Sequence, residues 1–146
     1  MTTTDSCVLL LVEDNPDDIF LMRRALKKTG LEVLMHIVTD GRQAIEYLSG
    51  TSQYEDRVQF PLPSMIFLDL KLPYLNGFEV LEWIRDTPGL SELDVSILTS
   101  SPEDRDKETA SRLGARAYLV KPPTSASLLE VLGNLQPQAM TAMAGR

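Results

Sequence analysis

The sequence has little of what stabilises or targets many extracytoplasmic proteins. It contains a single cysteine, Cys7, in 146 residues, so an intrachain disulfide is excluded. Residues 1–6 carry no basic side chain ahead of the apolar run that follows, and that run is too short for a signal peptide or a membrane span. These absences predict a cytoplasmic protein that has no membrane segment.

Positive charge is scarce as well. Fourteen Lys and Arg residues face 21 Asp and Glu residues, which gives a formal net charge of -7, and no basic run exceeds two residues. Nucleic acids and anionic membranes attract basic surfaces, so neither is expected as a direct partner. At this length the chain can bury roughly 70% of its unfolded surface, which suits one domain. We expect that domain over residues 6–136, and a disordered tail over residues 137–146.

What the sequence does contain is a series of short apolar runs separated by helical patterns. The runs show no polar alternation, which is typical of parallel strands that are covered on both faces. Five strands alternating with five helices predict an α/β domain with a doubly wound, five-stranded parallel sheet. The expected strands cover residues 7–12, 31–38, 65–69, 95–99 and 117–120, and the expected helices cover residues 16–29, 41–49, 78–85, 102–113 and 125–135.

Local signals mark where the first helix begins and ends. Asn15 is a suitable N-cap, Pro16 fits the first helical position, and Gly30 is a stop signal. Asp17 and Asp18 follow the cap, and we interpret them as charges that complement the helix dipole.

The later helices give weaker signals. Ser101 and Pro102 predict an N-terminus for the 102–113 helix, but only Ala110 and Leu113 form its apolar stripe, so we expect it to be weakly held. The 41–49 helix is expected to turn Ala44, Ile45 and Leu48 inward, and residues 51–63 form an unusually long loop.

Charged and hydroxyl side chains follow four of the five strands. Glu13 and Asp14, then Asp69, Thr99 and Lys121, each stand where a strand ends. Because parallel strands point the same way, these groups gather at one edge of the sheet. Three carboxylates together repel and need a cation, and Mg²⁺ prefers such oxygen ligands. Lysine and hydroxyl groups could hold the oxygens of a transferred phosphoryl group, with an aspartate as its nucleophile.

This constellation resembles the receiver domain of two-component response regulators. Thr99 follows Asp69 by 30 positions and Lys121 follows Thr99 by 22, spacings that are similar to those of the family, and the resemblance covers residues 6–136. It implies a flavodoxin-like sheet of order 2-1-3-4-5. It also implies that a partner histidine kinase phosphorylates Asp69, and that the protein is a switch rather than an enzyme.

The resemblance also implies individual roles. Asp14 would be a direct Mg²⁺ ligand together with Asp69, Glu13 would act through water, and Lys71 would contribute its backbone carbonyl. The remaining roles fall on three further residues and one peptide bond: Thr99 as switch hydroxyl, Lys121 as the lysine that contacts the phosphoryl group, Tyr118 as switch aromatic, and a cis bond between Lys121 and Pro122.

Three features are similar to the small stand-alone regulators that are paired with bacterial phytochromes. These are the opening over residues 12–18, the extra length in residues 51–63 and the lack of an output domain. The resemblance therefore implies a phytochrome-type kinase. We expect the signal to leave through the face formed by residues 102–113, 117–120 and 125–135, as a homodimer or a kinase complex.

Two other functions remain open. A phosphohydrolase with an aspartyl-phosphate intermediate generally carries an acid/base aspartate two positions after the nucleophile, where this chain has Lys71. A flavodoxin-like ligand-binding module needs a glycine- or hydroxyl-rich turn after the first strand, where Glu13 and Asp14 stand. His36 is the only histidine, and we expect it to be structural, so the phosphoryl donor must be another molecule.

Overall fold

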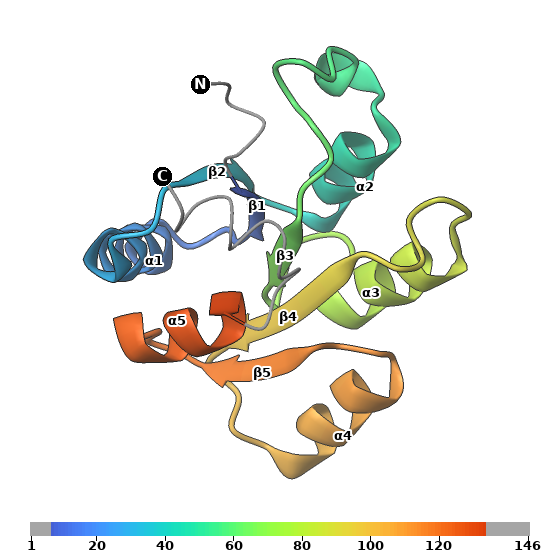
Figure 1. Cartoon of the computed structure of the whole chain (residues 1–146). Helices are drawn as coiled ribbons and strands as arrows, with labels where there is room; N and C mark the ends of the chain where they lie inside the picture. The colour runs from blue at the N-terminus through green and yellow to red at the C-terminus, as the bar shows by residue number, and fades with distance from the viewer. Residues whose placement is uncertain (1–6, 134–146) are drawn as a thin grey trace.

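A five-stranded parallel sheet forms the centre of the computed structural model, which describes residues 7–133. The strand order is β2-β1-β3-β4-β5, with α1 and α5 on one face and α2, α3 and α4 on the other (Figure 1). The predicted fold class is confirmed. The strands are β1 (Cys7–Val12), β2 (Val33–Val38), β3 (Met65–Leu68), β4 (Asp94–Thr99) and β5 (Ala117–Val120). The helices are α1 (Pro16–Thr29), α2 (Gly41–Ser49), α3 (Gly77–Asp86), α4 (Asp104–Arg112) and α5 (Ser125–Gly133), with a short 3-10 helix, η2 (Ser52–Tyr54).

The central strands are buried on both faces. All four residues of β3 are fully buried. In β1, Leu9 and Leu11 pack against α1 and α5, while Leu10 and Val12 pack against α2 and α3. Burial of each such side chain stabilises the fold by roughly 1.5–3 kcal/mol. The carboxyl end of β3, where Asp69 follows, is therefore held in place by the buried core.

Helix caps form as the local sequence predicts. The Asn15 side chain accepts hydrogen bonds from the backbone N–H groups of Asp17 and Asp18, and Gly30 ends α1 with a φ of 77°. Asp40 caps α2 in the same way, accepting from the N–H of Gln43 at 2.7 Å. The predicted tail, residues 137–146, and the last two residues of the predicted 125–135 helix lie outside the described residues.

Helix α4 begins two residues later than predicted. Its N-cap is Glu103, which has extended backbone and no side-chain capping bond, so Ser101 is not the cap. The Ser101 hydroxyl instead donates to the Asp106 carboxylate, and the Ser101 carbonyl accepts from the Tyr118 hydroxyl. The thin apolar stripe is confirmed, because Ala110 is the one buried residue of α4.

Residues 51–63 also differ from the predicted loop. Tyr54 in η2 is buried, and its ring packs against Tyr47 and Phe60 with centroids 5.1 and 5.2 Å away. Arg57 donates hydrogen bonds to the carbonyl oxygens of Tyr47, Leu48 and Phe60. This packing buries Tyr47, which the predicted inward face of α2 did not include, and it leaves Ile45 only half-buried. The second strand also begins at residue 33 rather than 31.

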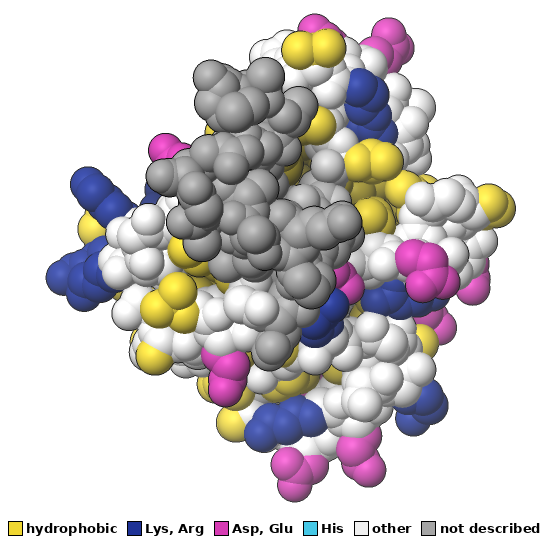
Figure 2. Space-filling view, viewed as in Figure 1, with side chains coloured by type: hydrophobic (Ala, Val, Ile, Leu, Met, Phe, Trp, Pro, Cys, Tyr) yellow, Lys and Arg dark blue, Asp and Glu magenta, His cyan; other side chains and the backbone are white. Residues whose placement is uncertain are grey.

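Charge is unevenly distributed over the surface. Although the net charge is -7, the second half of α1 exposes four cations: Arg23, Arg24, Lys27 and Lys28. Figure 2 shows Lys and Arg side chains at the left edge of the molecule, on the side of α1. Within residues 7–133, no helix is both long enough and apolar enough to cross a lipid bilayer.

Candidate functional site

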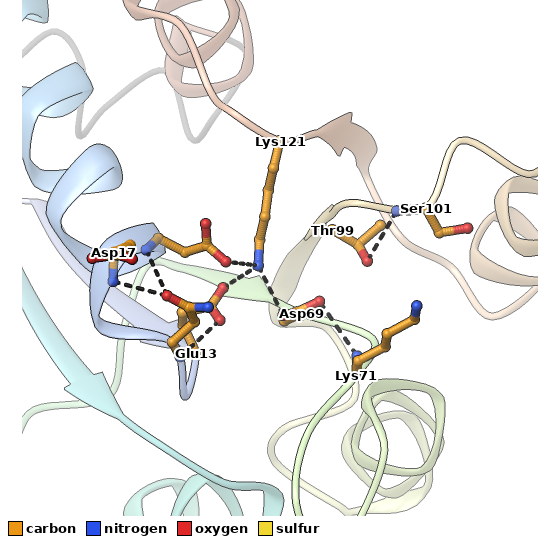
Figure 3. A network of polar contacts seen from close by, with 9 residues as sticks. Glu13, Asp17, Asp69, Lys71, Thr99, Ser101 and Lys121 are labelled. Carbon is orange, nitrogen blue, oxygen red and sulfur yellow. Dashed lines mark hydrogen bonds and ion pairs between the residues drawn. The ribbon is translucent and has the colours of Figure 1, made fainter.

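The predicted site residues do gather at one edge of the sheet. Glu13, Asp69 and Thr99 follow or end β1, β3 and β4, and they are 1%, 5% and 0% exposed. Lys121 follows β5 and extends toward Glu13 and Asp69 (Figure 3). Its peptide bond to Pro122 is cis, as the family resemblance implied.

The Lys121 ammonium group is held by three carboxylates. Nζ lies 2.9 Å from Asp69 Oδ2 and 2.9 Å from Asp18 Oδ2, and it forms an ion pair with Glu13. Burial alone lowers the pKa of Lys121, but its hydrogen bonds to these carboxylates raise the pKa well above its ordinary value. Lys121 is therefore a fixed positive charge beside Asp69.

Glu13 is a buried carboxylate that lies close to Asp69. Burial, followed by the nearby Asp69 charge, raises its pKa, while the hydrogen bonds from Lys121 and from the Asn15 N–H act in the opposite direction. A buried carboxylate next to another is costly to ionise, and a further cation would lower that cost. The electrostatics of the site thus favour a bound metal ion.

The donor set fits a hard divalent ion. Glu13, Asp14 and Asp69 each offer a carboxylate oxygen, and these oxygens lie within 4.8 Å of one another. Asp14 is exposed to solvent, so a bound ion could keep several of its waters. The backbone N–H of Lys71 donates to Asp69 Oδ1 at 3.3 Å, while the metal-binding role of its carbonyl group stays a prediction.

Close backbone packing positions the Asp69 loop. A Cβ atom on Gly77 would clash with the carbonyl oxygen of Asp69, and the Gly77 N–H donates to the carbonyl of Leu70 at 2.9 Å. Only glycine allows the first residue of α3 to come this close. Sequence reasoning missed this role of Gly77, since contact across a loop leaves no periodic signal.

Ser101 connects Thr99 with α4 and β5. Its N–H lies 3.5 Å from Thr99 Oγ1, its carbonyl accepts from the Tyr118 hydroxyl at 2.7 Å, and its own hydroxyl donates to Asp106 at 2.7 Å. Tyr118 is half-buried, and burial is the main cause that raises its pKa. The sequence missed this junction because it assigned Ser101 to a helix cap.

The structure also gives Asp18 a second role. The sequence assigned it only to the helix dipole, whereas its carboxylate binds Lys121 from the first turn of α1. The available signal was its place at the same sheet edge as Lys121, because α1 starts directly after β1.

The receiver class of signalling domains is defined by a flavodoxin-like sheet with an acidic cluster, a half-buried lysine and a buried threonine at its carboxyl edge. The model of the response regulator receiver domain family matches residues 9–133, and the chain belongs to that family.

Similar proteins share most of the chain. Response regulator Rcp1 of Synechocystis sp. is 33% identical over 129 residues, covering 88% of this chain and 86% of Rcp1. Among solved structures, the bacteriophytochrome response regulator RtBRR has 34% identity and a TM-score of 0.79, covering 96% of this chain and 90% of that one. The Mn²⁺-bound form of Rcp1 has 34% identity and a TM-score of 0.73, covering 87% and 90%. The chain is thus a receiver domain homologous to phytochrome response regulators.

Proposed function

We propose that this response regulator receives a phosphoryl group on Asp69 and so switches the face that it presents to other proteins. The observation that carries the proposal is the position of the Asp69 carboxylate. One oxygen bonds the Lys121 ammonium at 2.9 Å, the other accepts from the Lys71 N–H at 3.3 Å, and the residue offers one oxygen to the acidic cluster.

The transfer uses groups that are already in place. An Asp69 oxygen forms the new bond to phosphorus, the phosphorus–nitrogen bond of the donor phosphohistidine breaks, and the donor ring nitrogen keeps that electron pair. Lys121, fixed as a cation, neutralises charge on the phosphoryl oxygens. When bound at Glu13, Asp14 and Asp69, Mg²⁺ would supply further positive charge to the same oxygens.

We assign the site to a switch rather than to an enzyme that turns over other substrates. A phosphohydrolase would need an acid/base group near the acceptor, and at the position two residues after Asp69 this chain has Lys71, which is exposed to solvent. Lysine cannot take the role of that carboxyl group at neutral pH.

We further propose that the donor is a phytochrome-type histidine kinase in the cytoplasm. The name of one relative supports this partner, because RtBRR is a bacteriophytochrome response regulator. The Mn²⁺-bound form of Rcp1 supports a divalent ion as the metal of this chain.

The switch would act through α4, β5 and α5. A phosphoryl group drawing the Thr99 hydroxyl toward it would pull on Ser101, which holds both Tyr118 and the first turn of α4. Since α4 buries a single side chain, Ala110, bonds worth a few kcal/mol can shift it between two positions. A homodimer or a kinase complex formed through this face would then respond to phosphorylation.

Intact-mass analysis tests the acceptor directly. Full-length protein is incubated with phosphoramidate and Mg²⁺, and we expect one phosphoryl group on wild type and none on Asp69→Asn. Asp17→Asn is a matched control, because Asp17 is exposed and pairs with no cation in residues 7–133. Equal labelling of wild type and Asp69→Asn would refute the assignment.

Beryllofluoride with Mg²⁺ can replace the phosphoryl group to test the signalling face. We expect a change of sedimentation coefficient together with altered amide exchange in residues 100–120. If neither changes, the proposed route from Asp69 to α4 and β5 is wrong.

A further inference from the structure

A cleft that contains no residue of the acidic cluster lies between α2 and the loop that follows β3. Its volume is about 430 Å³, and five residues line it: Arg42, Ile45, Glu46, Tyr74 and Leu75. Three of these side chains are apolar or aromatic, and the other two carry opposite charges one helical turn apart. The cleft therefore combines an apolar surface with an edge that carries one positive and one negative side chain.

The position of Tyr74 in this cleft does not favour the stability of the fold. Its backbone adopts a φ of 70°, a conformation that bulky residues rarely occupy, and its side chain is 75% exposed. Neither feature stabilises the fold, because an exposed ring gains little from burial and glycine would fit this backbone without strain. Unfavourable placement of this kind is typical of residues that act in binding.

Arg42 has a similarly unfavourable position. It is the second residue of α2, where the helix dipole disfavours a cation and where the first turn contains no acidic residue. The guanidinium group lies 4.9 Å from the centre of the Tyr74 ring. Across residues 7–133 no carboxylate forms an ion pair with Arg42, since the Asp40 carboxylate bonds the Gln43 N–H instead. The stacked guanidinium thus keeps its N–H edge for an external anion.

The two walls of the cleft are fixed to each other. A Cβ atom on Gly41 would lie 2.7 Å from both the Cβ and the carbonyl oxygen of Leu75, so α2 meets the loop in direct backbone contact. A preformed cleft loses little conformational entropy when it is filled.

We propose that this cleft binds a segment of a partner protein in which an aromatic or aliphatic side chain stands next to an acidic residue. The apolar side chain packs on Tyr74, Ile45 and Leu75, and the acidic side chain pairs with the Arg42 guanidinium. Glu46, at the other end of the edge, repels a second acid and accepts a hydrogen bond from a donor. The inference does not depend on phosphorylation of Asp69.

A pair of blocked dipeptides tests both the apolar and the ionic contact. Nitrogen-15-labelled full-length protein is titrated with acetyl-Phe-Glu-amide and with its neutral counterpart acetyl-Phe-Gln-amide. We expect shifts confined to the amides of residues 41–46 and 74–76, and an affinity about threefold lower for the neutral peptide, as an exposed ion pair gives.

Three variants separate binding from folding. Tyr74→Gly should abolish the shifts while leaving the melting temperature equal or higher, since glycine tolerates the backbone conformation at this position. Arg42→Gln should fold normally and bind the two peptides equally, and Arg23→Gln, an exposed cation on α1, should behave as wild type. The proposal is overturned if shifts fall elsewhere, if Tyr74→Gly binds as well as wild type, or if wild type does not prefer the acidic peptide.

Discussion

The Lys121 ammonium lies 2.9 Å from the Asp69 carboxylate and the same distance from that of Asp18, so a single cation joins the ends of three elements. One of these bonds reaches from β5 to the first turn of α1, and the other reaches the end of β3. The buried Glu13 carboxylate completes the group. The lysine that neutralises the site therefore also ties the sheet edge together.

Replacing this cation should destabilise the protein in a way that metal can reverse. Lys121→Met leaves Glu13 and Asp69 buried without a counter-ion, and we expect the free energy of unfolding to fall by about 3 kcal/mol without metal. Urea titration should show a smaller loss with millimolar Mg²⁺, because a bound ion replaces the missing charge. Lys71→Met removes an exposed lysine and should cost little. A Lys121→Met protein as stable as Lys71→Met would contradict this role.

Metal affinity should depend on Asp14. Loss of a residue that only hydrogen-bonds to a metal ligand typically weakens metal binding about tenfold or more. Loss of Asp14, a direct ligand, should therefore weaken Mg²⁺ binding by at least about tenfold. Titration calorimetry can compare wild type with Asp14→Ala, and the fluorescence of Trp83 in α3 offers a second readout. Asp17→Ala, also exposed near the start of α1, is the control for charge alone. Equal affinities for wild type and Asp14→Ala would count against the ligand.

Loosening the junction at Ser101 should release α4 selectively. Ser101→Ala removes the 2.7 Å hydrogen bond to Asp106, which contributes about 1 kcal/mol. Amide exchange measured by mass spectrometry should become faster in Asp104–Arg112 and stay unchanged in α1. Ser111→Ala makes the same chemical change at an exposed position of α4 and should leave exchange unaltered or slower. Equal exchange in Ser101→Ala and wild type would show that the bond does not hold the helix.

His36 should make stability depend on pH in the weakly acidic range. Its ring packs 5.8 Å from the Tyr47 ring and 5.6 Å from that of Phe60, and its buried Nε2 has no hydrogen-bond partner in residues 7–133. Burial lowers the pKa of His36, so the unfolded chain binds the proton more readily. The contribution of His36 is complete above its unfolded pKa of about 6.5, falls as the pH drops through that value, and levels off below the folded pKa.

A variant isolates this effect from the other titrating groups. The difference in unfolding free energy between wild type and His36→Leu should shift in favour of the variant between pH 7.5 and pH 5.5. Burial raises the pKa of the neighbouring Tyr47 hydroxyl, which donates to the Pro61 carbonyl, to about 12, so this group does not titrate in this range. Parallel pH profiles for the two proteins would contradict the prediction.

Much of the fold could be predicted because its signals are local. The limits of β1 and β5 match the apolar runs, and the caps of α1 match because a side chain reaches only its own helix end. The gathering of Asp69, Thr99 and Lys121 could also be predicted, since parallel strands bring their carboxyl ends to one edge whatever the details of packing. The sequence alone thus determined the fold class and the family.

Tertiary structure decided which groups touch. Asp18 and Lys121 are 103 positions apart and meet only after β5 has taken its place in the sheet, so no spacing along the chain reports their bond. Tyr47 is buried in place of Ile45 because Tyr54 and Phe60 fold back over α2, and helical periodicity says which residues share a face but not what covers it. Contacts between distant segments depend on the packing of the whole domain, and for that reason they emerged only from the folded chain.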